Sequence, residues 1–121
     1  MSDENQDKID QAETAARAWL ALVDDGDYAA AWKSASAYMR GVVTKRGLRR
    51  SLRAARSPLG PVENRTLAGA EYRTSLPGAP DGQYVVIQYS SSFANKREAG
   101  ERITPVLEPD GQWRVSGYYI T

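Results

Sequence analysis

Apolar residues recur at helical spacing through the first half of the chain. One such stripe runs from Ile9 to Val23 and predicts an amphipathic helix. The segment Asp24-Asp25-Gly26-Asp27 ends it, because Gly26 suits a left-handed C-terminal cap and Asp27 suits the start of a second helix. That second helix is expected from Tyr28 to about Val43. The short connection predicts that the two helices are antiparallel. Thr44 is expected to cap a third helix, which the segment 57–61 ends with its two prolines.

The second half of the chain changes to an alternating pattern. It predicts strands at about residues 63–74, 83–93, 101–108 and 112–120, with Asp-Gly turns in 80–82 and 109–111 and a connection at 94–100. Helices followed by an antiparallel meander predict an α+β fold, with three N-terminal helices packed on a curved four-stranded sheet. By analogy with nuclear-transport-factor-like and cystatin-like folds, such a cone has a mouth that can hold a ligand.

Length and composition favour one domain. The chain has 121 residues, of which 41% are hydrophobic and 26% charged, as in ordinary globular domains. We expect a flexible acidic segment at 1–8 and a single α+β domain at 9–121. No apolar run approaches the length of a transmembrane helix, so no integral membrane segment is expected. The polar start does not resemble a signal peptide, which predicts a cytoplasmic location if the chain is complete as given.

The absence of Cys and His removes most of the usual site chemistry. It excludes disulfides, Cys–His and Ser–His–Asp catalysis and two-His metal motifs, so no metal or cofactor is expected. An enzyme would need a carboxylate and a tyrosine, as in ketosteroid isomerase. Glu71, Glu101 and several tyrosines provide these groups, but no spacing brings them together. We therefore assign no catalytic residues and expect a non-enzymatic binding domain.

Charge is divided along the chain. Residues 1–27 are strongly acidic, whereas 28–62 contain no acid and half of the basic residues. The predicted third helix concentrates arginines, including Arg49 and Arg53, on its polar face. Two interpretations remain open: a solvated face, or a docking site for an acidic protein partner. Nucleic acid is not expected, because no aromatic residues are interleaved with these arginines.

Aromatic residues divide between core and surface candidates. Trp19, Trp32, Trp113 and Tyr119 are expected in the core. Tyr84 and Tyr89 lie on opposite faces of one predicted strand, and the neighbours Tyr118 and Tyr119 also alternate, so one tyrosine of each pair must face away from the helices. A tyrosine that faces outward often marks a contact surface. The contact candidates are Tyr84, Tyr89 and Tyr118.

Two arginines flank the turn at 58–61. Arg56 and Arg65 together can grip a carboxylate or phosphate group. The alternative is an ion pair with a carboxylate of the sheet that fastens the loop, from among Glu63, Glu71 and Glu101.

Several segments of the sequence together resemble one bacterial family. They are Ala18-Trp19-Leu20-Ala21-Leu22-Val23-Asp24, Gly26-Asp27-Tyr28, Trp32, Arg56-Ser57-Pro58-Leu59-Gly60, Arg65 and the segment from Asp110 to Ile120. This pattern is similar to the family of unknown function DUF4019. Its members commonly begin with a secretion signal, so the resemblance implies a periplasmic location if such a signal was trimmed. It also implies a Trp where this chain has Leu48.

Small bacterial domains without cofactors and with charged surfaces often act by binding proteins. We therefore expect a protein-interaction module of the cell envelope, of immunity or inhibitor type. The alternatives are a small-molecule or lipid-binding pocket protein and a carboxylate–tyrosine enzyme.

Overall fold

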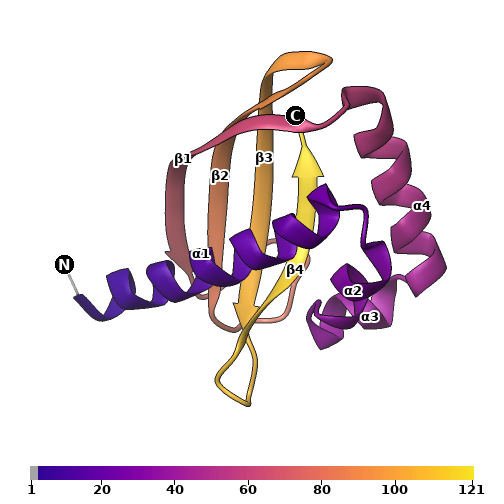
Figure 1. Cartoon of the computed structure of the whole chain (residues 1–121). Helices are drawn as coiled ribbons and strands as arrows, with labels where there is room; N and C mark the ends of the chain where they lie inside the picture. The colour runs from indigo at the N-terminus through magenta and orange to yellow at the C-terminus, as the bar shows by residue number, and fades with distance from the viewer. Residues whose placement is uncertain (1–2) are drawn as a thin grey trace.

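Helices form the first half of the chain and strands the second (Figure 1). The computed structural model describes residues 3–121, with side chains from Asn5 onward. The helices are α1 (Asp3–Asp24), α2 (Tyr28–Lys33), α3 (Ala37–Val42) and α4 (Lys45–Arg56), followed by a short 3-10 turn, η1 (Ser57–Leu59). The strands are β1 (Val62–Arg73), β2 (Tyr84–Phe93), β3 (Lys96–Leu107) and β4 (Trp113–Ile120). They form one antiparallel sheet in the order β1-β2-β3-β4, which confirms the predicted α+β class and meander.

The helix α1 crosses one face of the sheet (Figure 1). Its predicted stripe is buried against inward side chains of β2, β3 and β4, including Ile87, Ile103 and Val115. The helix is longer than expected and begins at Asp3. Residues 3–8, which the sequence assigned to a flexible segment, are therefore helical, while Met1 and Ser2 lie outside the described residues.

The connection after α1 follows the prediction, whereas the second helix does not. Gly26 has a φ of 76°, which favours glycine, and Asp27 accepts a hydrogen bond from the Ala30 amide as the cap of α2. The expected helix 28–43 is then divided into α2 and α3. The hydroxyl of Ser34 donates back to the Ala30 carbonyl, and Ser36 caps α3 by accepting from the Met39 amide. The apolar spacing continues across this break, so periodicity did not reveal it.

The helix α4 stands beside the sheet rather than on it (Figure 1). Thr44 caps it as predicted, accepting from the Gly47 amide at 3.0 Å. Leu48 and Leu52 are buried, and the helix packs mainly on α2 and η1. Gly60, with a φ of 74°, then turns the chain into β1, which crosses the top of the sheet in Figure 1 before it descends along β2.

The sheet departs from the predicted bounds at two connections. β3 begins at Lys96, because the predicted connection at 94–100 is only a two-residue turn, Ala94 and Asn95, and residues 96–100 already pair with β2 or extend β3. The segment 80–82 is the end of a longer loop between β1 and β2, in which the Gly82 amide donates to the Thr74 carbonyl. The turn at 109–111 is as predicted, with Gly111 at a φ of 84°.

A register shift in β4 reverses the expected orientation of its aromatic residues. Trp113 and Val115 are buried, and strict alternation would bury Tyr119 with them. The register instead runs Pro105↔Val115 and Thr104↔Gly117, so Ser116 is an extra residue. Tyr119 is consequently 51% exposed on the outer face, which corrects its assignment to the core. Tyr118 turns inward and meets the Trp19 ring edge-to-face at 5.3 Å.

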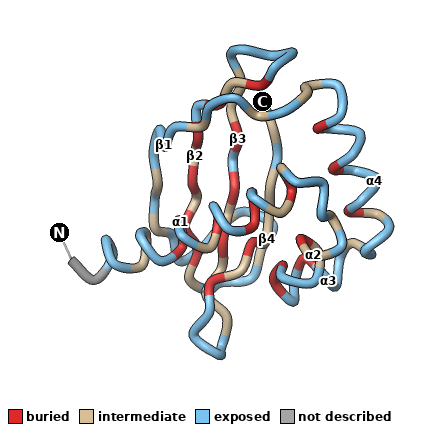
Figure 2. Tube along the Cα trace, in the orientation of Figure 1, coloured by how far each residue is buried: buried red, intermediate tan, exposed pale blue. Residues whose placement is uncertain are grey.

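The three tryptophans lie at different depths. Trp19 and Trp113 are buried, and Trp19 donates from Nε1 to the Ala31 carbonyl at 2.8 Å. Trp32 is only partly buried and donates to the Val43 carbonyl. Figure 2 shows the buried positions concentrated on the strands and on the sides of the helices that face one another.

Candidate functional site

A polar network lies buried between the C-terminal ends of α1 and α4 and the sheet. Arg65 of β1 is at its centre. Its Nε donates to Glu101 Oε1 at 2.7 Å, and its Nη1 donates to Asp24 Oδ2 at 2.9 Å. Arg56 also donates to Asp24, at 2.8 Å. Glu101 is 0% exposed and accepts further hydrogen bonds from Ser91, at 2.6 Å, and from the Tyr118 hydroxyl. We call these residues the buried polar network: Asp24, Arg56, Arg65, Ser91, Glu101 and Tyr118.

The network keeps both of its carboxyl groups ionised. Burial raises the pKa of Glu101, but hydrogen bonds from Arg65, Ser91 and Tyr118 outweigh it and hold the pKa below the usual 4.5. Burial likewise raises the pKa of Asp24, and the hydrogen bonds and charges of Arg65 and Arg56 bring it below 3.8. Burial and the Glu101 charge raise the pKa of Tyr118, so its hydroxyl stays protonated and donates. Two cations and two anions therefore balance within the interior.

Arg56 is the one member of the buried polar network whose buried nitrogen atoms lack hydrogen-bond partners among the described residues. The residue is 6% exposed, and its Nε and Nη1 are buried without a hydrogen-bond partner. Its guanidinium lies over the Phe93 ring, 4.8 Å from the centroid. This stacking compensates part of the desolvation of the cation.

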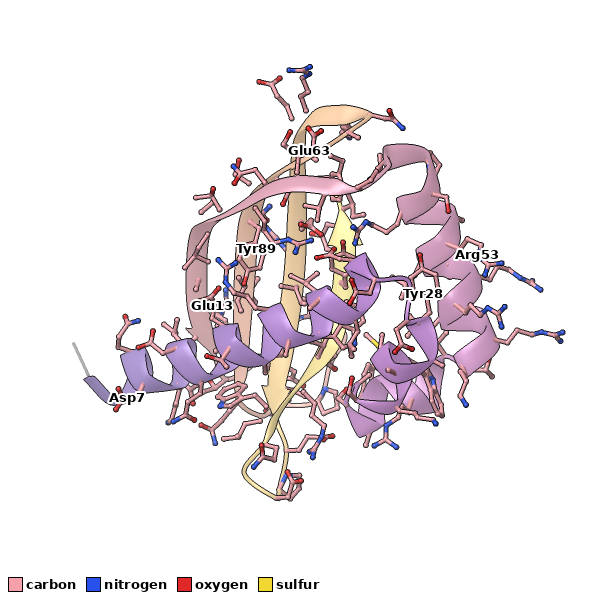
Figure 3. The ribbon with its side chains drawn as sticks, in the orientation of Figure 1. Asp7, Glu13, Tyr28, Arg53, Glu63 and Tyr89 are labelled. Atoms are coloured by element: carbon pink, nitrogen blue, oxygen red, sulfur yellow. The ribbon has the colours of Figure 1, made fainter. Side chains whose placement is uncertain are left out.

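A smaller cluster joins α1 to β2. The Tyr89 hydroxyl donates to Glu13 at 2.7 Å, and Arg17, one turn further along α1, pairs with the same carboxylate. Figure 3 shows Glu13 and Tyr89 facing each other between the helix and the sheet. Tyr89 is fully buried, so this cluster fastens α1 and presents no tyrosine to a partner.

Removing the Tyr118 hydroxyl tests the network directly. We expect Tyr118→Phe to lower the free energy of unfolding by about 1–3 kcal/mol, because a buried carboxylate loses a donor. Urea unfolding followed by circular dichroism measures this. Tyr119→Phe deletes the same group from the exposed neighbour and should change stability by less than about 0.5 kcal/mol. Equal effects of the two variants would contradict the role given to the Tyr118 hydroxyl.

The polar face of α4 is strongly basic. Its outward arginines border one shallow hollow and make no ion pair with the side chains described for residues 5–121; they are Arg46, Arg49, Arg50 and Arg53. Figure 3 shows Arg53 pointing away from the body of the protein. We call these four residues the arginine face. Most acidic residues of the segment 1–27 belong to α1, which lies across the sheet. Asp25 and Asp27 lie in the junction to α2, the helix that packs on α4, and form no ion pair with these arginines.

An apolar cleft of about 320 Å³ separates α4 from β4. Leu48, Ser51, Leu52 and Ala55 form one wall, and residues 118–120 form the other. Trp19 and Met39 contribute to its lining. The cleft exists because α4 packs on α2 and η1 and leaves the edge of β4 free.

The predicted site residues fall into separate places. Arg56 and Arg65 are brought together, but both bind Asp24, and Arg65 also binds Glu101, one of the carboxylates named in the ion-pair alternative. Arg49 and Arg53 are exposed on α4. Tyr84 and Tyr89 are buried, contrary to the expectation that they mark a contact surface. Tyr84 does face away from the helices, but the β1–β2 loop covers it, and its hydroxyl donates to the Pro80 carbonyl at 2.6 Å.

Sequence reasoning missed two members of the network, Ser91 and, of greater consequence, Asp24. Asp24 was assigned to the helix junction with Asp25 and Asp27, where acids commonly serve as caps. Its position at the end of an apolar stripe, in phase with Leu20, is the one local sign that it points inward.

The family model described as protein of unknown function (DUF4019) matches residues 15–118. The chain belongs to this family. The match extends from α1 into β4 and so includes the buried polar network, the arginine face and the cleft of this DUF4019 protein, apart from Tyr119 and Ile120. No curated protein matches the chain.

Two further findings concern ligands and membranes. Among the described residues of the DUF4019 protein, no group of three or more carboxylates is placed to hold a metal ion. None of the described helices is both long and apolar enough to cross a bilayer.

Proposed function

We propose that this DUF4019 protein is a non-enzymatic binding domain that docks an acidic protein partner on the arginine face. The observation that carries the proposal is the set of four exposed arginines on one helix that form no ion pair with the described side chains. Such a surface raises the rate of encounter with a negatively charged partner. An immunity or inhibitor role in the cell envelope is the form of this function that a small domain without Cys or His suits best.

The buried polar network favours a structural role over a catalytic one. Tyr118 and Glu101 do provide the pair that a ketosteroid-isomerase-like enzyme needs. However, Glu101 is fully buried and already accepts hydrogen bonds from Arg65 and Ser91, whereas a general base must reach its substrate. Its pKa is also lowered, away from the value that suits a base near neutral pH.

Charge reversal on α4 tests the docking proposal. Partners are captured from the native organism with immobilised wild-type protein, with R49E/R53E and with K96E/R97E, which makes the same charge change in the exposed β2–β3 hairpin. We expect an acidic protein retained by the wild type and by K96E/R97E but lost from R49E/R53E. With that partner purified, R49E/R53E should slow association by about tenfold or more at low salt, with less effect at high salt.

Unchanged association rates at both salt concentrations would exclude the arginine face as the docking site. Stability supplies the folding control, because each exposed reversal should alter the free energy of unfolding by less than about 0.5 kcal/mol.

A small-molecule or lipid ligand is the second candidate, favoured by the cleft between α4 and β4. Its volume of about 320 Å³ lies at the lower end of the range of about 300–1,000 Å³ found for small-molecule sites. Because Trp19 lines the cleft, titration with a fatty acid should change tryptophan fluorescence if this function holds, and Ser51→Trp, which fills the cleft, should abolish binding.

A further inference from the structure

The C-terminal half of β4 has main-chain hydrogen-bonding groups that no other strand uses. Gly100 and Thr121 exchange both of their backbone hydrogen bonds, at 3.1 and 2.8 Å. Such pairs alternate with pairs whose N–H and C=O point away from the partner strand. With the register Glu101↔Ile120 and Ile103↔Tyr118, it is Tyr118 and Ile120 that direct these groups outward. None of the described residues forms a hydrogen bond with them.

The N-terminal half of the same strand edge is covered by Ser36, which precedes α3. The Ser36 amide donates to the Val115 carbonyl at 2.9 Å, and the Ser36 and Ser116 hydroxyls lie 3.1 Å apart. This cover ends where the cleft begins. The free segment of β4 and the cleft are therefore one continuous groove, with α4 as its far wall.

The two edges of the sheet differ in their protection. β1, at the other edge, has two register shifts and carries Glu63, Glu71 and Arg73, features that discourage strand addition. The free segment of β4, residues 117–121, has no charged side chain, and its register with β3 is regular from Gly117 to Ile120. An unprotected edge that also opens into a groove is the geometry in which a peptide adds as a strand.

The groove also fixes where a side chain of the added strand would lie. Residues paired across two strands project to the same face of the sheet. Tyr118 and Ile120 project into the cleft, so a residue bonded to either one places its side chain there, against Leu48 and Leu52. The cleft has room for one large apolar side chain and lacks charged groups in its lining.

Three of the four elements that line the groove carry only positive charge, and the fourth, α1, lines it with Trp19 alone. α3, α4 and β4 contain no Asp or Glu; their basic residues are Arg40, Lys45, Arg46, Arg49, Arg50, Arg53, Arg56 and Arg114. Only Arg56 and Arg114 are neutralised by ion pairs with described side chains. The arginine face turns away from the cleft, but a helix is about 10 Å across, close to the Debye length of about 8–10 Å. The groove therefore complements an acidic chain.

We propose that an acidic, extended segment of the partner adds to β4 as a fifth strand and inserts an apolar side chain into the cleft beneath α4. This inference rests on the proposed function, since it names the form in which the acidic partner binds. A row of main-chain donors and acceptors favours a polypeptide over a small molecule, which would leave most of those groups unpaired.

A display library of random dodecapeptides, selected on the purified protein, tests the inference with a defined probe. Selected peptides should combine acidic residues with apolar residues at alternate positions. On binding of a selected peptide, the Tyr118 and Ile120 amide protons should exchange about tenfold more slowly or better, since each gains a hydrogen bond. The Tyr119 amide, which faces β3, should change little.

Variants at Ile120 separate the main chain from the side chain. The one backbone hydrogen-bonding group that Ile120→Pro removes is an N–H that β3 does not use, and this variant should weaken peptide binding about tenfold or more. Ile120→Ala also loses the isoleucine side chain but keeps that N–H, and should have the smaller effect. If Ile120→Pro fails to fold, hydrogen exchange of the wild type decides. Protection confined to residues other than 118 and 120, or a library without binders, overturns strand addition.

Comparison with R49E/R53E distinguishes the two proposals. Weakened binding by R49E/R53E together with wild-type binding by Ile120→Pro retains the arginine face and overturns strand addition. Weakened binding by Ile120→Pro together with wild-type binding by R49E/R53E supports strand addition and overturns the docking role of the arginine face. Fatty-acid binding that Ser51→Trp abolishes, without any peptide binding, assigns the cleft to a small molecule and overturns strand addition.

Discussion

Replacing Arg65 by methionine is expected to lower the free energy of unfolding by about 3–5 kcal/mol near neutral pH, which is a large part of the stability of a small domain. Arg65 is the residue that joins Asp24 to Glu101, and its loss leaves a fully buried carboxylate without a cation. Urea unfolding measures the loss. Arg73→Met is the matched control, because Arg73 pairs with Glu71 on the exposed surface of the same strand and should change stability by less than about 1 kcal/mol.

The stability difference between the wild type and Arg65→Met should also depend on pH. In the wild type the pKa values of Asp24 and Glu101 are lowered in the folded state, so their contribution is complete above about 4.5 and is lost as the pH falls through the lowered values. In the variant, we expect burial without Arg65 to raise the pKa of Glu101. Protonation at low pH then removes the cost of burying an unpaired carboxylate. The stabilities of the two proteins should therefore converge in acid. A constant difference across this range would contradict a charge-based role for Arg65.

Trp19→Ala should have an effect of similar size, a loss of about 3–5 kcal/mol. The substitution opens a cavity between α1 and the sheet, removes the edge-to-face contact with Tyr118 and deletes the hydrogen bond to the Ala31 carbonyl. Trp32→Ala is the comparison, and should cost roughly half as much because Trp32 is only partly buried. Urea titrations of both variants check the order. Equal losses would show that burial does not set the difference between the two rings.

The parts of the fold that follow from local patterns were predictable. The apolar stripe of α1, the cap at Thr44 and the turn at 109–111 each depend on residues within a few positions of one another. The break between α2 and α3 depends instead on Ser36, whose amide is bonded to Val115 far along the chain. Helical periodicity contains no information about such a contact.

The candidate site was predictable only in part for the same reason. The sequence indicated that Arg56 and Arg65 lie near each other and that α4 has a basic face. It did not indicate Asp24 as their partner, because that contact requires β1 to cross over the end of α1. Nor did it indicate the orientation of Tyr118, because one extra residue at Ser116 reverses the alternation of β4.

The buried polar network also constrains the order in which the chain can fold during synthesis. Its carboxylates and arginines come from α1, α4, β1 and β3, and Tyr118 comes from β4, which is synthesised after the other three strands of the sheet. Until β4 is present, β3 is the outer strand of the sheet, and Glu101 remains near water, where an unpaired carboxylate is most stable. The set of donors to Glu101 is thus complete only once β4 arrives and adds the Tyr118 hydroxyl to Arg65 and Ser91. The charges that stabilise the finished protein would delay premature closure of the nascent one.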